Sequence, residues 1–75
     1  MFDRIAQDPA VLGGKPHIRG TRISVEHLLE LVASGASRDD ICDALPQLGA
    51  EDVEEALRFA IAYLKNDMIL TAKVA

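Results

Sequence analysis

Four basic side chains near the N-terminus are the residues whose type and spacing come closest to a functional pattern. They lie within eight positions of one another: Lys15, His17, Arg19 and Arg22. Cationic side chains so close together can neutralise the phosphates of nucleic acid or enter a minor groove. The same residues can instead form a basic loop that pairs with acidic helices. They are therefore candidate DNA-binding residues, with a structural role as the alternative.

No set of side chains in the sequence has the pattern of a catalytic or metal centre. His17 and His27 have no cysteine pair or carboxylate at the spacing of metal ligands. The neighbouring carboxylates of Asp39–Asp40 and Glu54–Glu55 point to different faces of a helix, which makes them poor acid–base partners. The single cysteine, Cys42, excludes an internal disulfide and a cysteine-based zinc finger. The sequence therefore predicts a protein that is not an enzyme and uses no metal or cofactor.

The length of 75 residues allows one small domain. A core of that size supplies only about 3–5 kcal/mol of net stability, so we expect a homodimer or an obligate partner. Hydrophobic residues make up 49% of the chain, which excludes a disordered protein. No apolar run approaches the roughly 18 residues of a membrane span, and the N-terminus lacks a signal-peptide pattern. We expect no membrane association and a cytoplasmic location.

Residues 1–24 are predicted to form an N-terminal arm. Three of the five glycines and two of the three prolines fall here, which prevents a long helix. Short extended pieces remain possible at 4–7, 16–19 and 21–24, and such pieces must pack on helices or on a second chain. Residues 1–25 hold four basic and two acidic side chains, whereas residues 26–75 hold four basic and ten acidic ones. A basic arm thus leads into an acidic body.

Three amphipathic helices are predicted over residues 25–66. Ser24 is an N-cap for the first helix, at 25–34, and Gly35 ends it in a left-handed conformation. Ser37 and Asp40 have the spacing of a capping box at the start of a short second helix that Pro46 ends. The expected apolar faces of these two helices are Val25, Leu28, Leu29 and Val32, and Ile41, Ala44 and Leu45.

The third predicted helix begins near Gly49 or Ala50 and has two apolar flanks. Its main stripe is Val53, Ala56, Leu57, Ala60, Ile61 and Leu64, and Phe59 and Tyr63 lie to one side of it. So small a chain needs a further surface to cover the second flank, so we expect Phe59 and Tyr63 at a subunit or partner contact. Four carboxylates occupy the first turns of this helix: Glu51, Asp52, Glu54 and Glu55.

The order of the last two helices is typical of a helix-turn-helix. A short capped helix, a turn at 46–49 and a longer helix follow one another, and the helix at 25–34 completes a three-helix arrangement of the kind that reads DNA. Three amphipathic helices with short links also pack well for structural reasons alone. The carboxylates at the start of the third helix repel phosphate, so the basic arm is the better candidate for DNA contact.

An apolar tail, residues 67–75, is the last predicted segment. It contains four large apolar side chains: Met68, Ile69, Leu70 and Val74. Leaving them in water is unfavourable, so we expect this tail to cover a partner protein or to exchange across a dimer.

The run from Asp8 to Val25, with Gly-Gly-Lys-Pro-His-Ile-Arg-Gly-Thr-Arg at its centre, resembles the signature of the domain of unknown function 433 family. The similarity continues through residues 35–37, Ile41, residues 46–48 and residues 51–53. It implies a mainly α, three-helix, homeodomain-like fold of a bacterial or archaeal protein, preceded by the arm. It also implies an antitoxin that neutralises a PIN-like ribonuclease toxin and binds its own promoter DNA. The alternatives are a dimeric interaction adaptor that does not bind DNA, and an accessory subunit of an enzyme.

Overall fold

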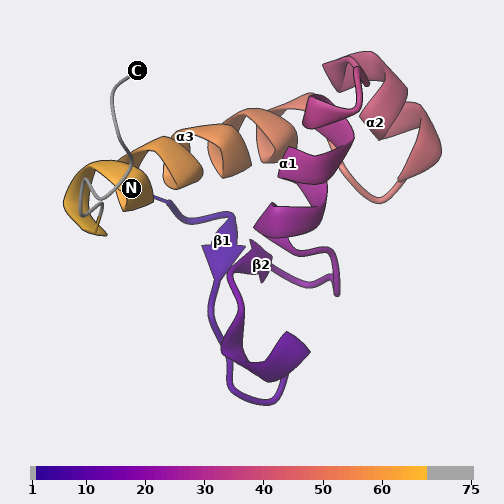
Figure 1. Ribbon diagram of the computed structural model, residues 1–75. Coiled ribbons are helices and arrows are strands. Elements are labelled where there is room, and N and C mark those ends of the chain that lie inside the picture. The colour runs from indigo at the N-terminus through magenta and orange to yellow at the C-terminus, as the bar shows by residue number, and fades with distance from the viewer. Residues whose placement is uncertain (1, 68–75) are drawn as a thin grey trace, which may run out of the picture.

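A computed structural model of the protein describes residues 2–67 and confirms the mainly α-helical architecture (Figure 1). The elements in chain order are β1 (Ile5–Ala6), the 3-10 turn η1 (Leu12–Gly14), β2 (His17–Ile18), α1 (Val25–Ala33), α2 (Arg38–Ala44) and α3 (Ala50–Asp67). The small sheet lies beneath α1 and α3, and the loop that carries η1 projects away from the helices. Residues 68–75, which include the predicted tail contacts Met68, Ile69, Leu70 and Val74, lie outside the described part of the chain.

The N-terminal arm folds as the expected extended pieces. β1 and β2 pair antiparallel, with Ile5 opposite Ile18, and an isolated bridge joins His17 to Ser24. Two consecutive glycines allow the turn between the strands, because Gly13 and Gly14 adopt φ angles of 64° and 88°. All three predicted pieces therefore take part in strand pairing.

The caps of the first two helices are those that the sequence predicts. The hydroxyl of Ser24 accepts a hydrogen bond from the amide of His27 at 2.9 Å, and Gly35, just past the end of α1, has a φ of 101°. Ser37 and Asp40 form a complete capping box at the start of α2. These local interactions fix where both helices begin, independently of the packing of the core.

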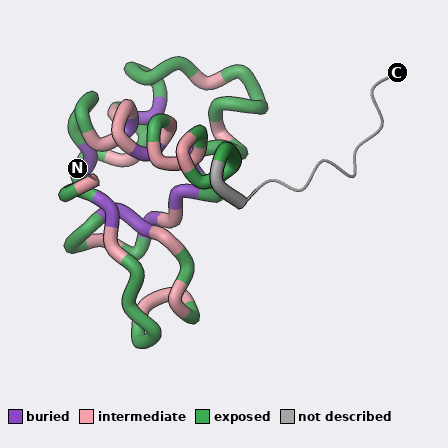
Figure 2. The backbone as a smooth tube through the Cα atoms, turned by 90° about the vertical axis from the view of Figure 1, so that its left-hand side faces the viewer, coloured by how far each residue is buried: buried purple, intermediate pink, exposed green. Residues whose placement is uncertain are grey.

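The core lies where the arm meets the three helices (Figure 2). The largest fully buried side chains are Leu28, Ile41 and Val53, one from each helix. Around them pack further buried residues from the arm and from α3, namely Ile5, Ile18, Ile23 and Ala56, among others. Because the arm supplies three isoleucines, its packing is required for the core to be closed.

Several predicted apolar positions are not in the core. Leu29 and Val32 on α1 are 38% and 39% exposed, Ile61 and Leu64 on α3 are 55% and 54% exposed, and Ala44 on α2 is also exposed. For Ile61 and Leu64 the physical reason is length. The 18 residues of α3 span about 27 Å, whereas the nine residues of α1 span about 13 Å, so α1 covers only part of α3.

Candidate interaction surface

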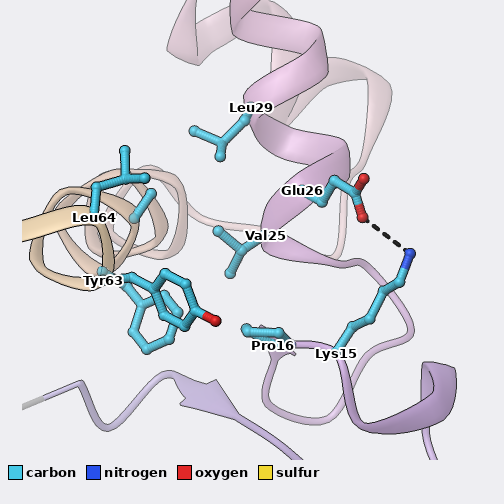
Figure 3. A pocket seen from close by; sticks show the side chains of 9 residues that line it. Lys15, Pro16, Val25, Glu26, Leu29, Tyr63 and Leu64 are labelled. Carbon is cyan, nitrogen blue, oxygen red and sulfur yellow. Dashed lines mark hydrogen bonds and ion pairs between the residues drawn. The ribbon is translucent and has the colours of Figure 1, made fainter. Parts of the chain in front are cut away.

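A predominantly apolar concave surface lies between α1 and the second half of α3 (Figure 3). It has a volume of about 300 Å³. We call it the α1–α3 groove, and its lining residues are Lys15, Pro16, Val25, Glu26, Leu29, Phe59, Ala60, Tyr63 and Leu64. The arm forms its floor through Pro16, α1 forms one wall and α3 the other. Leu29, Tyr63 and Leu64 are its most exposed large apolar residues.

Both aromatic residues that the sequence predicts at a partner contact line this groove. Phe59 is half-buried and Tyr63 is 51% exposed, with their ring centroids 6.1 Å apart. Phe59 also meets the edge of the Phe2 ring at a centroid distance of 5.4 Å and an interplanar angle of 88°. The Phe2 contact was not predicted. The sequence holds one indication of this contact: the arm contains an aromatic residue, Phe2, and the arm must pack on the helix that carries Phe59 and Tyr63.

One end of the groove is closed by an ion pair. The ammonium of Lys15 lies 3.0 Å from Oε1 of Glu26, which points toward it from the first turn of α1. Both side chains remain more than half exposed, at 61% and 63%. The groove is therefore apolar along its length and carries a paired charge at its rim, so its interior can accept apolar side chains without burying a charge.

The four candidate DNA-binding residues have different environments. His17 is buried, with 4% of its surface exposed, and its Nδ1 lies 3.1 Å from the carbonyl oxygen of Lys15. Its predicted contact with DNA conflicts with this burial, because the ring packs inside the arm. Arg19 donates from Nε to the carbonyl of Asp3 at 2.8 Å and from Nη2 to that of Ile5 at 3.3 Å. Lys15 pairs with Glu26, and Arg22 is exposed.

Arg4 forms an ionic contact that the sequence analysis did not identify. Its guanidinium lies 3.0 Å from Asp52, 3.7 Å from Glu51 and 3.9 Å from Glu55 at the start of α3. The hydrogen bond to Asp52 is the main reason that the pKa of Arg4 is raised. The difference in charge between the arm and the helices indicates that such ion pairs form, but it does not identify which residues pair.

The start of α3 receives a second arginine, from α2. Arg38 donates from Nη1 to the carboxylate of Glu54. Arg4 and Arg38 together donate hydrogen bonds to three of the four carboxylates in the first turns of α3, namely Asp52, Glu54 and Glu55. This end of α3 is therefore held to both the arm and α2.

Within residues 2–67, no three His, Cys, Asp or Glu side chains gather as a bound metal ion requires. Nor does the described chain contain a helix with the length and apolar character that crossing a bilayer demands.

Comparison with known proteins identifies relatives of the whole domain. A family model described as a protein of unknown function (DUF433) matches residues 5–60. The uncharacterized protein y4eO of Sinorhizobium fredii (strain NBRC 101917 / NGR234) is 38% identical over 58 residues, which make up 77% of this chain. The chain spans only 26% of that relative's length. A crystal structure of a DUF433 member from Anabaena variabilis ATCC 29413 superposes with a TM-score of 0.73 and 32% identity, covering 87% of this chain and 60% of the other.

Proposed function

The chain belongs to the DUF433 family, and we propose that it is an antitoxin that binds and neutralises a PIN-like ribonuclease toxin through the α1–α3 groove. The observation that carries this proposal is the contrast between apolar and charged side chains. Leu29, Tyr63 and Leu64 are exposed beside an apolar cavity. Arg4, Lys15 and Arg19 of the arm are instead engaged in ion pairs or hydrogen bonds within the domain. Apolar surface left in water favours a protein partner over a polyanion.

The proposed mechanism is occlusion rather than chemistry. A groove between two helices is suited to an amphipathic helix or an extended apolar segment of the partner, whose anchors fill the space beside Tyr63. Binding there would hold the nuclease in an inactive form without any catalytic group or cofactor on this chain. A homodimer remains part of the proposal, because a core this small gains stability from association.

Promoter binding is the second part of the proposal, and the order of α2, the turn and α3 is its support. Arg22, exposed in the turn before α1, is the arm cation best placed to reach a phosphate. If promoter DNA is bound, Arg22→Ala should lower the slope of log affinity against log salt by roughly 0.9, the value for one phosphate contact. Absence of any DNA binding at low salt would favour the interaction adaptor instead.

The antitoxin role predicts that a PIN-like nuclease is encoded beside this gene, and co-expression with that nuclease tests the role. The wild-type chain should restore growth of cells that express the nuclease and should co-purify with it. Leu29→Asp and Leu64→Asp should abolish both effects, because they place a charge in the groove. Ile61→Asp is the matched control, since Ile61 is exposed on the same helix but does not line the groove. Growth rescue that all three variants retain would show that the groove is not used.

A further inference from the structure

The hydroxyl of Tyr63 is a polar group inside the apolar α1–α3 groove. It points across the groove toward Pro16, which forms the floor (Figure 3). Phe59, one turn earlier on α3, contacts the Tyr63 ring at a centroid distance of 6.1 Å. An aromatic contact within the groove therefore helps to set where the hydroxyl lies.

The two charged side chains that line the groove pair with each other. The ammonium of Lys15 lies 3.0 Å from Oε1 of Glu26, so neither of these charges is unpaired. The Tyr63 hydroxyl, in contrast, has no hydrogen-bond partner among residues 2–67. In the free protein Tyr63 is 51% exposed, so water can serve this hydroxyl. The groove thus offers one neutral hydrogen-bonding side chain to whatever fills it.

A partner that fills the groove removes the water from this hydroxyl. A phenolic O–H that is buried without an acceptor is unfavourable, so a tight complex supplies one. A carboxylate is a poor acceptor here, because Lys15 is already paired with Glu26 and the walls are apolar. A carbonyl oxygen accepts the same hydrogen bond without burying a charge.

We propose that the partner places an extended apolar segment in the groove, and that a backbone carbonyl of this segment accepts a hydrogen bond from the Tyr63 hydroxyl. Extended backbone suits this role, because a helix uses its carbonyls internally except in its last turn. From Phe59 to Leu64 the groove follows α3 for about 7.5 Å, which is about the rise of two extended residues. The inference rests on the proposed function, because it concerns the protein that the groove holds.

This contact makes Tyr63 a residue that determines specificity. The apolar walls, which include Leu29 and Leu64, accept many hydrophobic side chains. A hydrogen bond has a preferred length and direction, so the hydroxyl fixes the register of the segment along the groove. A segment that leaves the hydroxyl buried and unpaired binds more weakly.

Tyr63→Phe tests the hydrogen bond, because it removes the hydroxyl and keeps the ring. In calorimetry against the PIN-like nuclease that the proposed function predicts, this variant should bind about tenfold more weakly than the wild type, which corresponds to 1.4 kcal/mol. Leu64→Asp should weaken binding at least as much, and Ile61→Asp, which does not line the groove, should bind as the wild type does. Far-UV circular dichroism verifies that each variant is folded.

A spectroscopic measurement separates the hydrogen bond from packing of the ring. Tyr63 is the only tyrosine of the chain, so tyrosine labelled with carbon-13 at Cζ reports on this residue alone. In an equal mixture of light and heavy water, a hydroxyl that is hydrogen-bonded and shielded from water exchanges slowly and splits the Cζ signal. The wild type bound to unlabelled nuclease should show this splitting. Backbone chemical shifts of the nuclease residues that contact Tyr63 should be those of extended chain.

The outcomes distinguish the inference from the function on which it rests. Weaker binding by Leu64→Asp with wild-type affinity of Tyr63→Phe would overturn the inference and leave the proposed function standing. Tighter binding by Tyr63→Phe would also overturn it, because the hydroxyl would then be buried without an acceptor. An unsplit Cζ signal in the complex, or helical shifts in the contacting nuclease segment, would overturn it as well. No binding of the nuclease by the wild type would overturn both.

Discussion

Arg4 donates from Nη1 to Oδ1 of Asp52 at 3.0 Å, and this contact ties the start of the arm to the first turn of α3. The amide of Arg4 also donates to Glu55 at 2.6 Å. The arm is thus bound to the acidic first turns of α3 in the same chain. This is why the arm is part of the domain rather than a free basic extension.

Replacing Arg4 should destabilise the protein in a salt-dependent way. Arg4→Gln removes the contacts to Glu51, Asp52 and Glu55 and leaves three carboxylates near one another. The melting temperature should fall, and the fall should shrink as salt is raised to about 1 M, because exposed charges are screened there. Thermal melts over a salt series measure this. Arg22→Gln is the control, and equal melting temperatures for the two variants would contradict the role of Arg4.

Replacing Arg19 should destabilise the protein more than replacing Arg22, although both side chains are exposed. The Arg19 guanidinium donates to the carbonyls of Asp3 and Ile5 and so holds β1 against β2. Arg19→Ala should cost about 1 kcal/mol of unfolding free energy, whereas Arg22→Ala should change it by less than about 0.5 kcal/mol. Urea denaturation provides both values. A cost at Arg22 equal to that at Arg19 would contradict this assignment.

Thr21 should be required for the turn that leads into α1. Its hydroxyl donates to the carbonyl of Ile18 at 2.8 Å and accepts from the amide of Ile23 at 3.0 Å. Thr21→Val keeps the shape and leaves both backbone groups without that partner, at a cost of about 1–3 kcal/mol. Thr21→Ser retains the hydroxyl and should recover most of the loss in urea denaturation. Similar stabilities for Val and Ser would show that the hydroxyl contributes little.

The sequence predicts the local parts of this fold, but not the contacts between residues that are far apart in the chain. The caps at Ser24 and Ser37 and the extended arm pieces follow from local residue types, which act over a few positions. Phe2 on Phe59 and Arg4 on Asp52 join residues about 50 positions apart, so no local pattern specifies them. Periodicity places Leu29 and Leu64 on apolar helix faces without telling how far a neighbouring helix covers each face, and both side chains are exposed in the structure.

The capping box of α2 should give a distinct pH dependence. The pKa of Asp40 is lowered, mainly because its carboxylate accepts a hydrogen bond from the Ser37 amide and also because it interacts with the Ser37 side chain. A lowered pKa stabilises the fold above the ordinary value of 3.8, and this contribution disappears as the pH falls through the folded-state pKa.

Asp40→Asn should therefore be less stable than the wild type at neutral pH. The difference should begin to shrink near pH 3.8 and should vanish once the pH has fallen through the lowered folded-state pKa, where the wild-type carboxylate is itself protonated. Urea denaturation of both proteins at neutral pH and at about pH 2 measures the difference in their unfolding free energies at each pH. Asp39→Asn, in the same helix and outside the box, controls for the loss of one charge. A difference in unfolding free energy that stays constant with pH would show that ionisation of Asp40 does not stabilise the start of α2.

The central claim is that this chain acts by holding a protein in the α1–α3 groove, and a binding titration tests it most directly. The claim predicts that a PIN-like nuclease is encoded beside the gene, and that nuclease, once purified, is titrated with the wild type, Leu64→Asp and Ile61→Asp by calorimetry. A charge buried in the groove should weaken binding at least about tenfold, which corresponds to 1.4 kcal/mol, while Ile61→Asp should bind as the wild type does. Equal affinities for Leu64→Asp and the wild type, or no binding by the wild type, would contradict the claim.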